Sequence, residues 1–162
     1  MYVTALQLID MFGDKEVALL SSEDPAVTDV LLRLTIEGGD RSAYSAADQT
    51  AADQALVKLA GAIDSATRFI NSYISPRYTL PLAQALVDGS SLADVCADIA
   101  RHRLSDDRVT EEVENRFNQA RSWLRDISIN KASLGELDTA TATPQGQVKT
   151  EQGVSKTDWD TY

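Results

Sequence analysis

The stretch from Ala51 to Ile74 constrains the fold most, because its apolar side chains recur at helical spacing along its whole length. Steps of three and four residues place these side chains on one broad face of an α-helix, which can pack on more than one neighbour. Ser75-Pro76 ends the pattern, since proline disfavours a helical conformation in the residue before it. The sequence therefore predicts a long helix with an inner face of Leu56, Leu59, Ala60, Ile63, Ala66, Thr67, Ile70, Tyr73 and Ile74.

Shorter helices are predicted before this long helix. Thr4 and Gln7 have the spacing of a capping box, and Gly13 suits the left-handed position that ends a helix. Val3 and Leu8 have the spacing of a hydrophobic staple around the same cap. A first helix is therefore expected to end just before Gly13.

Residues 14–50 give weaker signals. Asp14 is placed to cap a short helix over residues 15–20, and Pro25 is placed to open another that runs through Leu34. Gly38-Gly39 indicates a break, and the small polar residues 42–49 indicate a loop or a frayed helix start. No functional role is assigned to residues 21–50.

A stiff connector and two further amphipathic helices follow. Pro81 favours an extended backbone over residues 77–82. Ser91 is placed to cap one helix, and Ser105 is placed to start the last long one. Their inner faces are predicted to carry Leu92, Val95, Ile99 and Arg103, and then Val109, Val113, Phe117, Ala120, Leu124 and Ile127.

These patterns together predict an all-α fold. We expect a small bundle of three long amphipathic helices, with the short N-terminal helices packed against it. After residue 137 the composition changes to threonine, glutamine and glycine with few apolar side chains, which predicts a flexible tail over residues 138–162. The expected division is a helical domain of residues 1–137 followed by this tail.

Charge and cysteine content exclude several classes of protein. The chain of 162 residues has a formal net charge of −10, so tight non-specific binding to nucleic acid or to anionic membranes is not expected. Cys96 is the single cysteine, which rules out an internal disulfide framework and predicts a small core residue. Without a signal-peptide pattern or a membrane-spanning apolar run, we expect a soluble product made in the cytoplasm.

A search for chemistry finds one candidate metal site. Asp94, Asp98 and His102 recur at four-residue steps on one helix face, and two carboxylates with an imidazole can bind a divalent metal. The alternative, which we favour, is that Asp98 pairs with Arg101 or Arg77 and holds the connector against the helix. We therefore predict no catalytic residue, no metal and no cofactor, and expect that the protein is not an enzyme.

Two segments carry a family resemblance. They are residues 77–82, Arg-Tyr-Thr-Leu-Pro-Leu, and residues 96–104, Cys-Ala-Asp-Ile-Ala-Arg-His-Arg-Leu. With the amphipathic segments around them, from Tyr2-Val3-Thr4 to Leu134-Gly135, they make the chain resemble a Mu-like bacteriophage family of neck proteins. These proteins sit between the portal of the capsid and the tail.

The resemblance implies a function and a set of partners. The function is that of a structural virion protein of the neck, a head–tail connector or adaptor that completes the head. The implied partners are the portal protein, a tail or tail-terminator protein, and further copies in a ring of twelve, through which DNA passes without specific binding. The location would be the virion neck, and the host cytoplasm during assembly. The alternative is a cytosolic helical adaptor or regulatory protein that binds one protein partner.

Four residues are candidates for protein contacts. Arg77 and Tyr78 either contact a neighbouring subunit or the portal, or form an intrachain corner with the tyrosine packed under the helices. We favour the corner. Trp159 and Tyr162 either anchor the tail on a partner, as aromatic side chains often do, or belong to an end without a role. Both readings of the tail stay open.

Overall fold

The computed structural model describes residues 1–135, which form α-helices and one 3-10 turn and contain no strand. The prediction of an all-α fold is confirmed. The elements are α1 Ala5–Phe12, α2 Asp14–Ser21, α3 Asp29–Glu37, α4 Ala46–Ile74, α5 Gln84–Asp88, α6 Leu92–Ser105, η1 Asp106–Arg108 and α7 Glu111–Ser128.

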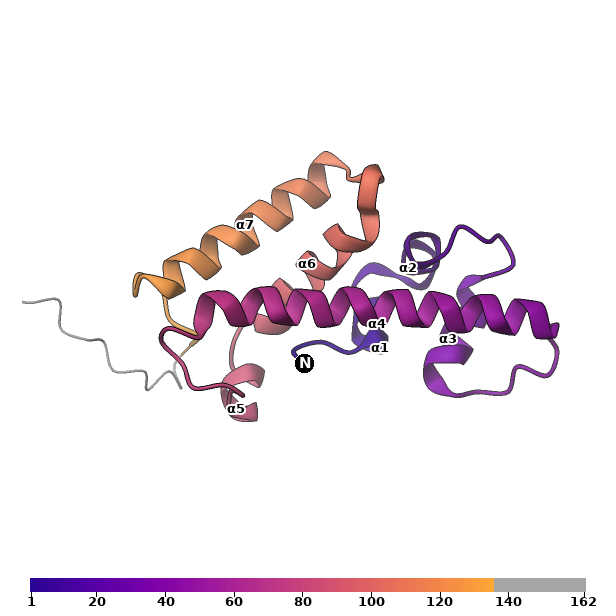
Figure 1. Cartoon of the computed structure of the whole chain (residues 1–162), viewed down its shortest axis with the longest axis horizontal. Coiled ribbons are helices and arrows are strands. Elements are labelled where there is room, and N and C mark those ends of the chain that lie inside the picture. Colours follow the sequence, from indigo (N-terminus) through magenta and orange to yellow (C-terminus); the bar gives the residue numbers. More distant parts are fainter. Residues whose placement is uncertain (136–162) are drawn as a thin grey trace, which may run out of the picture.

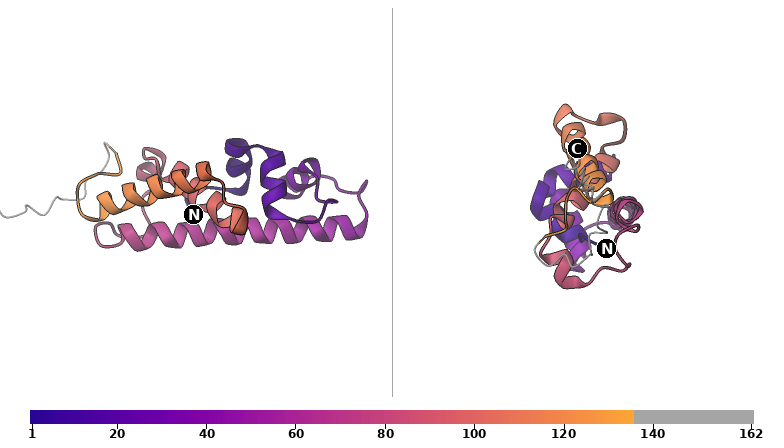
Figure 2. Two further views of the ribbon diagram at one scale, coloured as in Figure 1. Left: turned by 90° about the horizontal axis from the view of Figure 1, so that it is seen from above. Right: turned by 90° about the vertical axis from the view of Figure 1, so that its left-hand side faces the viewer.

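The long helix α4 organises the molecule (Figure 1). It contacts α1, α2 and α3 as well as α6 and α7, so one helix joins the N-terminal helices to the C-terminal pair. In Figure 2 the other helices all lie to one side of α4. The buried face of α4 explains this arrangement, because it provides the fully buried side chains of Leu59, Ile63, Ile70 and Ile74.

The first turn of α4 lies further upstream than predicted. Ser45 and Asp48 form a capping box, in which the Ser45 hydroxyl accepts from the Asp48 backbone at 3.1 Å and the Asp48 carboxylate accepts from the Ser45 backbone at 3.2 Å. Aspartate thus performs the role usually held by glutamate, and the helix begins at Ala46 instead of near Ala51. The predicted end before Ser75 is confirmed.

The N-terminal helices confirm one predicted cap and correct two. Thr4 and Gln7 form the expected capping box of α1, which ends at Gly13 with a φ of 89°. Asp14 is the first residue of α2 and does not cap it; no side chain does. Helix α3 begins after Thr28, whose hydroxyl accepts from the Leu31 backbone at 3.2 Å, and not at residue 25.

The C-terminal helices correct three further predictions. Ser91 precedes α6, but its side chain makes no capping hydrogen bond. Asp106 has a φ of 45°, which ends α6, and α7 begins only after Thr110, whose hydroxyl accepts from the Val113 backbone at 3.4 Å. Arg103 is exposed, and the buried position beside it belongs to Leu104.

The connector between α4 and α5 is bent and not straight. The chain turns at residues 75–77 and bends again at Leu80 and Pro81, whose peptide bond is cis. Cys96 is fully buried in the core, as predicted, with its sulfur 3.8 Å from the Thr67 hydroxyl. Trp123 is partly buried at the edge of the core.

Candidate interaction surfaces

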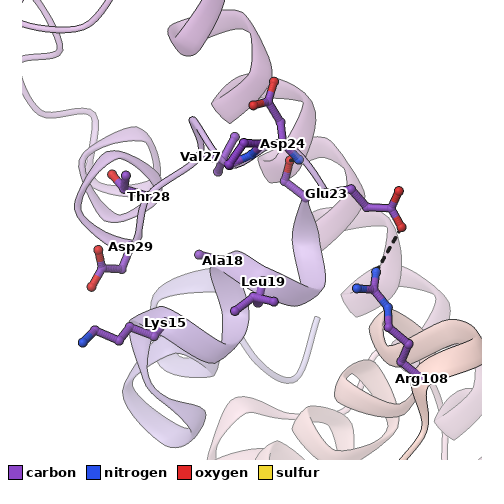
Figure 3. Close-up of a pocket in the computed structure, with 11 residues that line it drawn as sticks. Lys15, Ala18, Leu19, Glu23, Asp24, Val27, Thr28, Asp29 and Arg108 are labelled. Carbon is purple, nitrogen blue, oxygen red and sulfur yellow. Dashed lines mark hydrogen bonds and ion pairs between the residues drawn. The ribbon is translucent and has the colours of Figure 1, made fainter.

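An apolar groove lies between α2 and the segment that leads into α3 (Figure 3). Its volume is about 540 Å³. Ala18 and Val27 form buried parts of its lining, whereas Leu19 on α2 remains 67% exposed. Covering so exposed a leucine with another apolar group lowers the free energy by about 25 cal/mol for each Å² of apolar surface removed from water.

Charged side chains surround this groove, and most of them already have partners. Arg108 from η1 donates to Glu23 at 3.0 Å. Asp24 accepts from the Ala26 backbone at 2.9 Å, and Asp29 accepts from the Val30 backbone at 3.0 Å. Lys15 also lines the groove, and it forms no ion pair with any side chain of residues 1–135.

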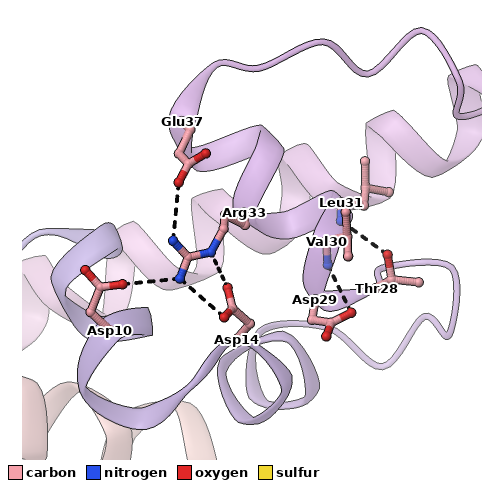
Figure 4. A network of polar contacts seen from close by, with 8 residues as sticks. All are labelled: Asp10, Asp14, Thr28, Asp29, Val30, Leu31, Arg33 and Glu37. Atoms are coloured by element: carbon pink, nitrogen blue, oxygen red, sulfur yellow. Dashed lines mark hydrogen bonds and ion pairs between the residues drawn. The ribbon is translucent and has the colours of Figure 1, made fainter.

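Arg33 fixes the helices around the groove relative to α1 (Figure 4). Its guanidinium contacts Asp14 on α2 at 2.5 Å, Asp10 on α1 at 3.2 Å and Glu37 on α3 at 3.3 Å. The hydrogen bond from Arg33 lowers the pKa of Asp14. The same bond, together with the bonds to the other two carboxylates, raises the pKa of Arg33 above its ordinary value. The carboxylate predicted to cap α2 therefore serves a contact between helices.

A second polar cluster joins α6 to its neighbours. Arg101 is 12% exposed and contacts Glu16 on α2 at 2.5 Å and Glu112 on α7 at 3.6 Å. Its guanidinium also lies 4.7 Å from the centroid of the Phe12 ring. One partly buried arginine thus links α6 to α1, α2 and α7, and it lies on the helix that carries the second family-like segment.

The predicted partners of Asp98 are wrong. Asp98 contacts Arg116 on α7 at 3.6 Å, and not Arg101 or Arg77. Burial raises the pKa of Asp98, and the charge of Arg116 partly opposes that effect. The acid therefore links α6 to α7, and the connector is held by other contacts.

His102 also faces α7. Its Nε2 lies 2.9 Å from Glu114, and its ring stacks on Phe117 with centroids 4.1 Å apart. The hydrogen bond with His102 lowers the pKa of Glu114. Within residues 1–135, no group of three His, Cys, Asp or Glu side chains is arranged to hold a metal ion.

Arg77 and Tyr78 lie at an intrachain corner. Arg77 donates to the backbone carbonyls of Ile127 and Ala132 at 2.9 and 2.8 Å, and so joins the end of α4 to the end of α7. Tyr78 is 8% exposed, with the Arg77 guanidinium 5.1 Å from its ring centroid. A role of either residue in contacts between proteins stays a prediction, as does that of Trp159 and Tyr162, which lie outside the described residues.

Sequence reasoning missed the groove. Leu19 stands among apolar residues of α2, and the sequence gives no sign that it faces solvent while Val17 and Ala18 are buried. The segment that forms the opposite wall lies in residues 21–50, which had no predicted role. Only the packing of α3 against α2 brings these two walls together.

The fold and these surfaces define a small all-α protein with an apolar groove and charged helix faces that suit contacts with other proteins. No helix of the described residues combines the length and apolar character needed to cross a bilayer. The chain matches the family model described as "Bacteriophage Mu, Gp36" over residues 2–152, and it therefore belongs to this family of bacteriophage Mu proteins.

One curated relative supports the phage assignment. It is "Gene product J" of Escherichia phage Mu, which is 28% identical to this chain over 115 residues. The aligned region covers 71% of this chain and 74% of the relative. No solved structure matches the chain.

Proposed function

We propose that this protein is a structural component of a phage neck, where it forms a ring between the portal and the tail and completes the head. The observation that carries the proposal is membership of a phage Mu family over residues 2–152. The neck position itself comes from the resemblance of residues 77–82 and 96–104 to Mu-like neck proteins. The same membership favours this function over a host regulatory adaptor, and it supports a structural role over an enzymatic one.

The surface of the domain offers charged groups for contacts between ring subunits. In a ring, each copy presents two different surfaces to its two neighbours, and the rotation between copies closes the assembly. Helix α7 offers exposed charges for such a contact, with acidic side chains in its first turn and basic side chains further along. Opposite charges across the interface would set the register of neighbours and disfavour wrong partners. The exposed charges on this face are Glu111, Glu112, Glu114, Arg116, Arg121 and Arg125.

The charge of the chain suits a channel for DNA. With a net charge of −10 per copy, a ring of about twelve copies would carry a strongly negative field, which repels phosphates from its wall. DNA would then pass through the lumen without being held. The partners of the ring would be the portal protein on one side and a tail or tail-terminator protein on the other.

A cryo-EM map of the virion neck tests the proposal directly. The expected result is a ring of density between portal and tail into which residues 1–135 fit as one body, in several copies around the axis. Mass spectrometry of purified particles provides an independent check. The proposal fails if finished particles lack the chain, or if the purified protein turns over a small molecule.

A further inference from the structure

We propose that the apolar groove beside Leu19 receives the segment around Trp159 from a neighbouring copy of the chain. The groove consists of Lys15, Ala18, Leu19 and a wall formed by residues 22–25 and 27–29, with Arg108 at its edge. This proposal rests on the proposed ring, because it names a contact between ring neighbours. It assigns a role to residues 21–50 and a receptor to the aromatic tail.

The groove fits an aromatic anchor in size and character. Its volume of about 540 Å³ lies within the roughly 300–1,000 Å³ of sites that hold small organic groups. Leu19 stands exposed at its floor, and Ala18 and Val27 extend the apolar lining. An indole ring can cover this lining because a buried tryptophan removes up to about 250 Å² from water. The apolar contact is therefore the main source of affinity.

The charge of Lys15 favours the same segment. Trp159 stands between Asp158 and Asp160, so an anchor inserted here brings two carboxylates to the rim of the groove. Lys15 stands at that rim without an ion pair to residues 1–135. Of the other charged groups of the groove, Glu23 pairs with Arg108 at 3.0 Å, and Asp24 and Asp29 each accept a backbone hydrogen bond. Lys15 and an acidic aromatic segment carry opposite charges, and their pairing orients the anchor.

The position of the groove favours a neighbouring copy. Arg108, which borders the groove, comes just before the first residue of α7. The described chain ends at Gly135, after the last residue of α7. The groove and the end of the described chain therefore lie at opposite ends of α7 (Figure 1). Two different surfaces at opposite ends are what a head-to-tail contact requires. Helix α7 spans about 27 Å, and the 24 residues from Gly135 to Trp159 reach at most about 80 Å, which is ample for the next subunit.

Cysteine cross-linking in phage particles tests this contact. The variant combines Glu23→Cys at the groove with Thr161→Cys near Trp159, and both single variants serve as controls. Glu23 is exposed, so its replacement should leave the fold intact. Cys96 is fully buried and burial raises the pKa of its thiol, so it should not join the reaction. Oxidised particles of the double variant should contain a ladder of covalently joined subunits that neither single variant gives.

A matched pair of substitutions tests the role of the groove. Added to the double cysteine variant, Leu19→Asp should reduce the cross-linked fraction roughly tenfold, because it removes the apolar floor. Val57→Asp is the control, since Val57 is 72% exposed against 67% for Leu19 but lies on α4 away from the groove. Equal losses in both variants would contradict the proposal.

The other outcomes are separable. A cross-link within single chains would show that the segment covers the groove of its own copy, and no cross-link in particles that contain the chain would show that the groove has another occupant or none. Either result overturns the proposal but leaves the ring intact. If the unmodified chain is absent from particles, the proposed neck function fails first, and the contact between ring neighbours fails with it.

Discussion

Arg33 gathers carboxylates from α1, α2 and α3 around a single guanidinium. The side chains are partly exposed, so each pair alone contributes little and is screened by salt. Their common partner nevertheless couples three short helices that have few turns of their own. The hydrogen bond from Arg33 lowers the pKa of Asp14 below its ordinary value of 3.8.

This contact predicts a pH dependence of stability. Because the folded state lowers the pKa of Asp14, its stabilising contribution is complete above pH 3.8 and is lost as the pH falls through the lower, folded value. We expect Asp14→Asn to reduce the stability at neutral pH and to flatten its decline in acid. Urea unfolding at a series of pH values measures both effects. Asp64→Asn, which removes an exposed pair within α4, is the control; an equal change there would contradict the assignment.

Helix caps decide where the elements of this fold begin. Side chains of Thr4, Thr28, Ser45 and Thr110 each accept a backbone hydrogen bond at the start of a helix. Ser91 occupies the same position before α6 without making that bond. The difference is physical, since only an extended backbone at the cap aims the hydroxyl at the free N–H groups. Ser91 has a φ of −80° and a ψ of 17° instead.

A pair of serine substitutions tests this difference. Ser45→Ala should lower the free energy of unfolding by about 1 kcal/mol, because it leaves backbone donors of α4 without their acceptor. Ser91→Ala should change it by no more than a few tenths of a kcal/mol, as is usual at an exposed site without such a bond. Chemical denaturation of both variants provides the comparison. Similar losses in the two would mean that Ser91 caps α6 after all.

The Arg77 corner links two elements that are distant in the sequence. Its guanidinium binds carbonyl groups at the end of α7, while its own position is set by the end of α4. Arg77→Met should retain the apolar stem and lose these bonds, at a cost of roughly 1.5–3 kcal/mol, because hydrogen bonds to a charged group are involved. Arg68→Met on the exposed face of α4 should cost much less. Thermal and urea unfolding measure both, and equal losses would contradict the structural role.

At the scale of the whole molecule, residues 1–135 form one continuous core. Side chains from α1, α2, α4, α6 and α7 all contribute to it, and Leu134 is still part of it. The core is shared between N-terminal and C-terminal helices through α4, so we expect the domain to unfold in one cooperative step. The division after residue 137 stays a prediction.

Removal of residues 138–162 tests that division. The shortened chain should keep its helical circular dichroism and its melting temperature, since the core lies within residues 1–135. It should no longer add to portal-bearing heads if the tail holds the subunit in place. A shortened chain that unfolds would show that the tail belongs to the folded domain. Normal incorporation into particles would instead refute the anchoring role of Trp159 and Tyr162.

The sequence by itself determined the all-α class, the end of the central helix at Ile74, the cap at Thr4 and the burial of Cys96. These features depend on the local spacing of residue types and on apolar periodicity, which the order of residues alone specifies. The tertiary structure alone decided that Asp98 meets Arg116, that Arg33 binds Asp14, and that Leu19 borders a groove. The physical reason is that partners on different helices are chosen by how the helices pack, and one face of a helix does not specify what will lie against it.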